Sequence, residues 1–212
     1  MPAVLPPDAQ VEIAPMPPTG EEVVAPPSPE ALAEVPPPRP RRRGLVLEST
    51  LGVLGFGGEF GHVSPPAYWL HAQLGYEVLD PLMVFVEGEL AFADTSEAAD
   101  PSSSRAFPIW GFGAGARGTL HATPRVALFV QGEIGALAAD VPHDALALYG
   151  FRNAESLIYS FGARWGVEWY GLDRHVALTM QLGGRDATGF AKVATAGTAL
   201  MWDAGAGIRY TF

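Results

Sequence analysis

Apolar and polar side chains alternate with a period of two in eight separate runs between Leu45 and Phe212. In each run one face carries large apolar residues and the other carries small or charged ones, which is typical of a β-strand with one apolar face. The first run sets Leu45, Leu47, Leu51 and Val53 against Glu48, Thr50 and Gly52. Eight strands are an even number, as closure of an antiparallel barrel with both termini at one end requires.

The other seven runs repeat this division. Their apolar positions are, run by run, Leu70, Ala72, Leu74 and Tyr76; Val84, Val86, Leu90 and Phe92; Trp110, Phe112, Ala114 and Leu120; Leu128, Val130 and Ile134; Tyr159, Phe161, Trp165, Val167 and Trp169; Val176, Leu178, Met180 and Leu182; and Trp202, Ile208, Tyr210 and Phe212. No run has the 18 or so consecutive apolar residues that a membrane-spanning helix needs. The pattern therefore predicts an all-β chain.

The connections between the runs alternate in length. Short turns are expected at 79–81, 121–125 and 170–174, and longer polar loops at 57–66, 94–107, 138–156 and 183–196. Outer-membrane barrels have short periplasmic turns at one end and long surface loops at the other. The connections therefore favour an eight-stranded antiparallel up-and-down transmembrane β-barrel over residues 44–212.

Charged side chains lie on the face opposite the large apolar residues. They are Glu48, Glu77, Glu87, Glu89, Glu133, Glu168 and Asp203, together with Arg117, Arg164 and Arg209. A lysine or arginine on the lipid face near the midplane costs about 2 to 4 kcal/mol, so the charged face is expected to line the lumen. The lumen of an eight-stranded barrel is only wide enough to be filled by side chains. A salt-bridged plug is the first interpretation, and an acidic cation path or proton relay is the alternative.

Aromatic residues of the apolar face cluster at the ends of the runs. Phe92, Trp110, Tyr159 and Trp202 are expected near the long loops, and Tyr76 and Trp169, with Tyr210 and Phe212, near the short turns. Two aromatic belts of this kind mark the two interfaces of a membrane.

The last six residues read GIRYTF and end the chain on an aromatic side chain. With the eight runs before it, this ending resembles the small eight-stranded bacterial outer-membrane barrels of the OmpA, OmpX and OmpW type. The resemblance covers residues 44–212. It implies location in the bacterial outer membrane, contact with its lipid, and an assembly signal at Gly207, Ile208, Tyr210 and Phe212 that the barrel-assembly machinery reads.

Residues 1–43 differ in composition from the rest of the chain. They contain 13 of the 20 prolines, several acidic residues and a basic run at Arg39 and 41–43. Such a segment cannot bury enough apolar surface to offset its ordering entropy. It is predicted to be a disordered, proline-rich periplasmic arm that ends in the basic run, with the domain boundary at residue 43.

Composition excludes several function classes. The chain has no cysteine, which removes thiol chemistry and cysteine metal sites. Its net charge is −10 without a basic stripe, so nucleic acid is not an expected partner. The sequence GAGARG at 113–118 matches a dinucleotide fingerprint but precedes a turn and no helix. No nucleophile and base are expected at the same end of the barrel, so the chain is predicted to be no enzyme and to have no cofactor or metal.

Three functions remain. The first is a structural and interaction component of a cell-envelope assembly, such as a trans-envelope motility machine (gliding motility included) or a secretion machine, whose arm binds periplasmic or envelope proteins. The second, implied by the OmpW resemblance, is a narrow channel or a conduit for hydrophobic solutes. The third is a soluble lipocalin-like barrel with its apolar face turned inward around a ligand, which the lack of an export signal in the first ten residues favours.

Overall fold

The computed structural model describes residues 44–79, 81–96, 105–141, 145–171, 175–192 and 199–212. The predicted arm, its basic run and the domain boundary at residue 43 lie outside the described residues, as do parts of the turns at 79–81 and 170–174. Within the described ranges no helix is long and apolar enough to cross a membrane.

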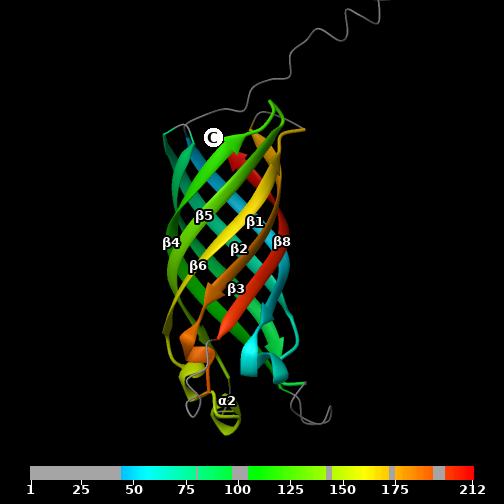
Figure 1. Cartoon of the computed structure of the whole chain (residues 1–212), viewed down its shortest axis with the longest axis vertical. Coiled ribbons are helices and arrows are strands. Elements are labelled where there is room, and N and C mark those ends of the chain that lie inside the picture. The colour runs from blue at the N-terminus through cyan, green and yellow to red at the C-terminus, as the bar shows by residue number, and fades with distance from the viewer. Residues whose placement is uncertain (1–43, 80, 97–104, 142–144, 172–174, 193–198) are drawn as a thin grey trace, which may run out of the picture. The chain divides into compact units, whose positions relative to one another are not determined.

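Eight antiparallel strands form one closed barrel in which each strand pairs with its neighbours in the sequence and β8 pairs with β1 (Figure 1). The predicted all-β, eight-stranded, up-and-down barrel is therefore confirmed. The strands are β1 (Leu45–Phe56), β2 (Ala67–Leu79), β3 (Leu82–Asp94), β4 (Ala106–His121), β5 (Val126–Ala139), β6 (Ile158–Trp169), β7 (Val176–Asp186) and β8 (Leu200–Thr211).

The seam between β1 and β8 closes the barrel through the chain's last residues. Leu47 lies opposite Tyr210, and the Phe212 amide donates to the Leu45 carbonyl at 2.9 Å. Closure leaves no strand with an unpaired edge, which removes the usual template for edge-to-edge aggregation.

The apolar face points outward and the polar face points inward. In β1 and β2 exposed leucines and tyrosines alternate with buried residues such as Glu48 and Gln73. The soluble alternative, with its apolar face turned inward, is therefore wrong. The pleat allows only one of the two faces to be inside, and a one-residue shift in register would exchange them.

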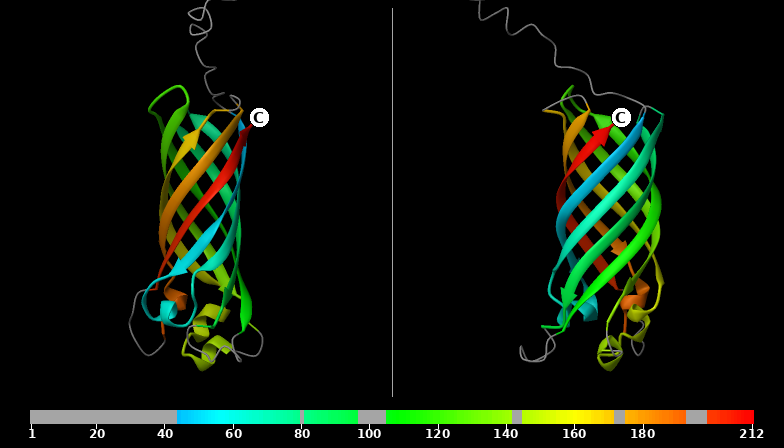
Figure 2. Two further views of the ribbon diagram at one scale, coloured as in Figure 1. Left: turned by 90° about the vertical axis from the view of Figure 1, so that its right-hand side faces the viewer. Right: turned by 180° about the vertical axis from the view of Figure 1, so that it is seen from behind.

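Short helices lie at the end of the barrel opposite the C-terminus (Figures 1 and 2). They are η1 (Gly58–His62), α2 (Ala145–Leu148), η3 (Arg152–Glu155) and η4 (Thr188–Phe190). α2 lies within the predicted loop at 138–156, with Leu146 buried. We call this end the loop end and the other the turn end.

Three loop boundaries predicted from the sequence are wrong. β4 begins at Ala106, β5 continues to Ala139 and β7 continues to Asp186, so the loops are shorter than expected. The predicted loop at 183–196 begins with Gly183-Gly184. Here Gly183 lies inside the barrel, where an added Cβ would be 2.4 Å from the Arg164 side chain, so the glycine makes room for that side chain.

Candidate functional site in the barrel interior

Glycines on β4 make room for long side chains from β3. An added Cβ would lie 2.8 Å from Glu89 Oε1 at Gly111 and 3.1 Å from Glu87 Oε1 at Gly113. Gly113 is also the first residue of the GAGARG sequence, all of which lies within the strand β4. Because glycine has no side chain, the carboxylates of Glu87 and Glu89 can extend across the lumen toward arginines on other strands.

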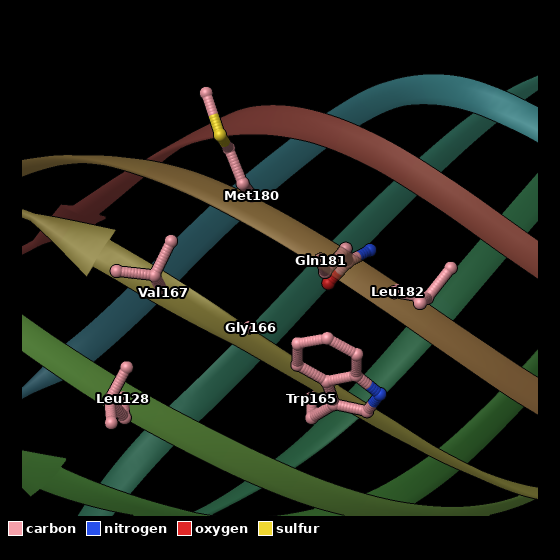
Figure 3. Close-up of a pocket in the computed structure, with 7 residues that line it drawn as sticks. All are labelled: Leu128, Trp165, Gly166, Val167, Met180, Gln181 and Leu182. Carbon is pink, nitrogen blue, oxygen red and sulfur yellow. The ribbon is translucent and has the colours of Figure 1, made fainter.

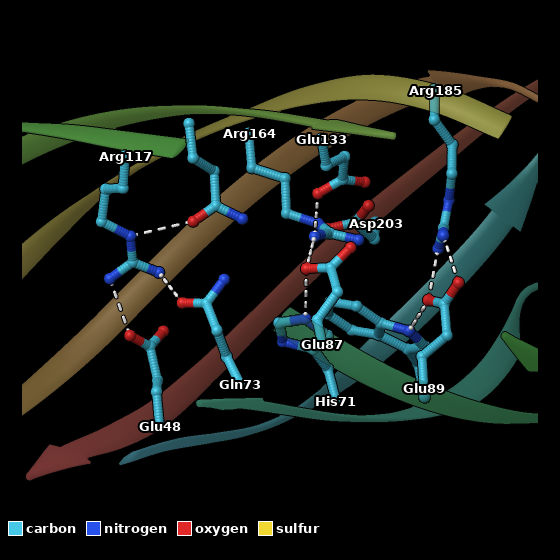
Figure 4. Close-up of polar contacts among 12 residues, drawn as sticks. Glu48, His71, Gln73, Glu87, Glu89, Arg117, Glu133, Arg164, Arg185 and Asp203 are labelled. Atoms are coloured by element: carbon cyan, nitrogen blue, oxygen red, sulfur yellow. Dashed lines mark hydrogen bonds and ion pairs between the residues drawn. The ribbon is translucent and has the colours of Figure 1, made fainter. Parts of the chain in front are cut away.

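Arg117 on β4 holds a fully buried polar cluster near the turn end. Its Nη1 donates to Glu48 Oε2 at 2.7 Å and to Glu168 Oε1 at 3.1 Å. Its Nε and Nη2 donate to the amide oxygens of Gln131 and Gln73, both at 2.9 Å (Figure 4). The guanidinium also stacks over the Phe129 ring, 4.1 Å from its centroid.

Arg209 on β8 extends this cluster toward the turn end. It donates to Glu168 Oε1 at 2.6 Å and to Glu77 Oε1 at 2.5 Å. Tyr170, which follows β6, donates its hydroxyl hydrogen to Glu168 Oε2 at 2.6 Å. Burial and the neighbouring Glu168 carboxylate raise the pKa of Tyr170 above its ordinary value. We call these residues the Arg117 cluster: Glu48, Gln73, Glu77, Arg117, Gln131, Glu168, Tyr170 and Arg209.

Arg164 on β6 forms a second cluster, nearer the middle of the barrel. Its Nε donates to Asp203 Oδ1 at 3.0 Å, and its Nη1 pairs with Glu87 Oε2 at 3.1 Å and with Glu133 Oε2. His71 Nε2 lies 2.9 Å from Glu87 Oε2 (Figure 4). We call these five residues the Arg164 cluster.

A third pair lies closer to the loop end. Both terminal nitrogens of Arg185 bind the Glu89 carboxylate, with Nη2 at 2.7 Å from Oε2, and Trp69 Nε1 donates to Oε2 at 2.8 Å. Arg185 was not predicted as a lumen residue, because it lies in the segment predicted to be the loop at 183–196. Continuing the alternation past Leu182 by three residues would have placed Arg185 on the charged face.

The structure places all ten charged residues of the predicted lumen network inside the barrel and joins them, with Arg185, into these three groups. It places the six predicted girdle residues on the outside of the wall: Phe92, Trp110, Tyr159 and Trp202 toward the loop end, and Tyr76 and Trp169 toward the turn end. Tyr68, which is 80% exposed near the loop end and lies opposite Phe92, was not predicted.

The predicted assembly signal lies on the last strand. Ile208, Tyr210 and Phe212 point outward, and the rings of Tyr210 and Phe212 are in edge contact with centroids 4.8 Å apart. Gly207 points inward, where an added Cβ would be 2.4 Å from the Ser49 carbonyl oxygen. The three apolar side chains therefore form one outward row beside β1.

Above the charged clusters the loop end is closed by a hydrophobic cap. Phe60 of η1 contacts the rings of Phe151, which precedes η3, and Phe190 of η4, at centroid distances of 5.0 and 4.9 Å. All three rings are buried. Side chains from three separate loops thus meet over the loop end of the barrel.

The described residues offer few other sites. No group of three His, Asp or Glu side chains among them has the arrangement to hold a metal ion.

A furrow of about 250 Å³ lies on the outer wall over β5, β6 and β7 (Figure 3). It is lined by Leu128, Trp165, Gly166, Val167, Met180, Gln181 and Leu182, which is an almost entirely apolar set. Such a furrow suits hydrocarbon rather than a polar substrate.

The fold is similar to that of Neisserial surface protein A, with a TM-score of 0.59 and 16% identity over 80% of this chain and 97% of that protein. The N-terminal β-barrel domain of Pseudomonas aeruginosa OprF matches with a TM-score of 0.46 and 14% identity, over 81% of this chain and all of that one. Ail, the attachment invasion locus protein of Yersinia pestis, matches with a TM-score of 0.43 and 10% identity, over 79% and 97%. No protein-family model and no curated protein matches the chain.

At these identities the comparisons concern the fold alone. The predicted resemblance to small eight-stranded outer-membrane barrels is confirmed at that level.

Proposed function

We propose that this chain is a non-enzymatic outer-membrane barrel that anchors a component of a cell-envelope assembly. One observation carries the membrane part of the proposal: large apolar side chains cover the outer wall of a closed barrel, and the charged side chains within the strands, away from the strand ends, point into its interior. Such a surface is unfavourable in water, and soluble monomers rarely expose large contiguous apolar patches. The same surface is favourable in a bilayer, where a closed barrel leaves no backbone hydrogen-bonding group of its strands unpaired.

The spacing of the outer aromatics fits the thickness of a membrane. On β6, Tyr159 and Trp169 are ten residues apart and both are exposed. Ten residues of a strand tilted by about 40° rise by about 25 Å, which is the height of the apolar band of an outer-membrane barrel. The side chains between them that face outward, such as Trp165, are apolar.

Paired substitutions on the outer wall test the membrane proposal. Val130→Arg puts a charge at mid-strand on the wall, and Leu120→Arg puts the same charge one residue from the end of β4. In lipid vesicles we expect Val130→Arg to lower the free energy of unfolding by about 2 to 4 kcal/mol and Leu120→Arg by about 0 to 1 kcal/mol. Equal effects of the two arginines, or recovery of the wild type from the soluble fraction of cells, would contradict the proposal.

The anchoring role rests on residues 1–43, whose composition predicts a disordered arm. A proline-rich segment is suited to partner recognition because its extended conformation loses little entropy on binding. We propose that it reaches periplasmic or envelope proteins, as in a motility or secretion machine.

Deletion of residues 1–43 is expected to leave insertion of the barrel intact and to abolish recovery of partners after cross-linking in intact cells. A full-length chain with the four arginines of the basic run changed to glutamine separates the charge of the arm from its length. Recovery of the same partners with the deleted chain would refute the anchoring role without affecting the membrane proposal.

We do not propose the narrow conduit as a second function. Side chains of the Arg117 and Arg164 clusters cross the lumen, and the buried rings of Phe60, Phe151 and Phe190 lie over its loop end. Ion or solute flux across planar bilayers is therefore expected to stay at the background level.

A further inference from the structure

The Arg164 cluster holds more negative charge than its arginine balances. Glu87, Glu133 and Asp203 all bind the one Arg164 guanidinium, which gives the cluster a net charge of −2 when His71 is neutral. The Arg117 cluster has two arginines for three carboxylates, a net charge of −1, and Arg185 has one carboxylate. The excess of negative charge is therefore concentrated around Arg164.

The carboxylates of this cluster lie close to one another. Glu87 and Glu133 both accept from Arg164 Nη1, and Asp203 accepts from Nε of the same guanidinium. Glu133 and Asp203 each form one ion pair among the described residues, with Arg164, whereas Glu87 also pairs with His71. Three carboxylates around one guanidinium inside the barrel repel one another. A bound proton or cation offsets this repulsion.

Among the described residues, the titratable and charged groups at this site come from six strands, β2, β3, β5, β6, β7 and β8. Arg164 and Arg185 attract the Glu133 carboxylate, while Glu87 and Asp203 repel it. Glu89 and His71 act on Glu87 from β3 and β2. Since Arg185 is already bound by Glu89, it does not neutralise the cluster.

A second observation comes from buried polar atoms that have no partner. Asp203 Oδ2 and Arg164 Nη2 form no hydrogen bond with any described residue, although each side chain is only 1% exposed. The described residues also form no metal site here. A protonated carboxyl group removes one negative charge and adds an O–H donor, which is what the unpartnered acceptor Asp203 Oδ2 lacks.

We propose that the Arg164 cluster is a buried proton-binding site, in which Glu87, Glu133 and Asp203 share one proton in the folded barrel at neutral pH. With the proton bound, the net charge of the cluster becomes −1 and equals that of the Arg117 cluster. This inference concerns the barrel alone and stands whether or not the N-terminal arm binds a partner.

The proposal has a defined sign for the pH dependence of stability. Carboxyl groups of the unfolded chain are ionised at neutral pH, so the folded barrel binds one proton more than the unfolded chain. The free energy of unfolding therefore falls as pH rises above the ordinary carboxyl range, until the folded cluster releases its proton.

Infrared absorption of the folded barrel in detergent micelles tests the proton directly. At neutral pH we expect the absorption of one protonated carboxyl group per chain. Glu133→Gln, Glu87→Gln and Asp203→Asn should each abolish it, because two carboxylates on Arg164 have no need of the proton. Glu48→Gln, a matched change in the Arg117 cluster, should leave it in place. Three cluster variants are used so that one that fails to fold does not end the test.

Urea unfolding between pH 5 and 9 supplies the second measurement. The midpoint of the wild type should fall with rising pH, and the midpoint of Glu133→Gln should not. His71→Gln is expected to keep both the slope and the infrared band. The proposal is wrong if the folded wild type shows no protonated carboxyl group at neutral pH, or if the band survives all three cluster changes. It is also wrong if the slope disappears in His71→Gln, which would assign the proton to the imidazole.

Discussion

The hydrophobic cap closes the loop end of the barrel and the Arg164 cluster lies in the lumen, and the two are stabilised in different ways. The cap consists of buried rings such as Phe60, Phe151 and Phe190, whose contribution grows with the area removed from water. The Arg164 cluster consists of charges whose contribution depends on each partner being present. We therefore expect the cap to tolerate conservative changes and the cluster not to.

The position of the cap over the loop end also affects the strength of the charge interactions in the lumen. The cap covers the loop end, so the charges below it interact in a medium of low dielectric constant. In such a medium an ion pair is stronger and an unpaired charge is more costly. A break in the cap should therefore weaken the clusters as well, whereas a break in a cluster should leave the packing of the cap unchanged.

Removal of Arg164 should have the largest effect. Arg164→Leu leaves three buried carboxylates without their cation, and we expect a loss of about 5 kcal/mol in the free energy of unfolding, the upper end of the range for a broken buried pair. Arg164→Lys should be nearly as damaging, because one ammonium group does not reproduce the two separate directions of the guanidinium nitrogens. Urea titration in lipid vesicles, followed by tryptophan fluorescence, measures both. A lysine variant as stable as the wild type would contradict this account.

Truncation of the cap should come next. Phe60→Ala removes a fully buried ring that contacts Phe56, Phe151 and Phe190, and is expected to cost about 3 to 4 kcal/mol. Phe60→Leu keeps most of the buried volume and should cost less than about 1.5 kcal/mol. The same urea titration checks this contrast. If leucine at this position is as harmful as alanine, the cap depends on ring geometry rather than on buried area.

The barrel and the direction of its faces could be predicted from the sequence because both follow from the period of two. Glu87 and Glu133 could be assigned to the lumen on that basis alone. The partners of each charge could not, since Arg164 meets carboxylates from β3, β5 and β8, and contacts across a lumen depend on strand tilt and stagger. Arg185 was missed because it lies in the segment predicted to be the loop at 183–196. The cap was not predicted because its three phenylalanines are isolated in the loop sequences.

Loss of one hydrogen bond at the turn end should have a moderate effect. Tyr170→Phe removes the hydroxyl that donates to Glu168 Oε2, and we expect a loss of about 1.5 kcal/mol at neutral pH. The raised pKa of Tyr170 means that the folded barrel keeps the phenolic proton longer than the unfolded chain does. Wild-type stability should therefore fall as pH rises above about 10, the ordinary tyrosine range, and this part of the fall should be absent in Tyr170→Phe. Identical alkaline unfolding curves would exclude Tyr170 as the source.

The smallest effect is expected at the rim of the cap. Lys192 Nζ lies 2.6 Å from Glu59 Oε2 and so links the loop after η4 to η1, but both side chains are partly exposed to solvent. The hydrogen bond and charge of Lys192 lower the pKa of Glu59 below its ordinary value of 4.5. The contribution of the pair to stability is therefore present above pH 4.5 and disappears as pH falls through the lowered pKa of Glu59.

Lys192→Met should lower the unfolding midpoint slightly at neutral pH, and by less in high salt, because exposed ion pairs are weak and screened. Glu59→Gln should give the same small shift, and the double variant should add nothing to it. Additive shifts would mean that Lys192 acts instead through the Phe151 ring, over which its ammonium lies at 5.6 Å.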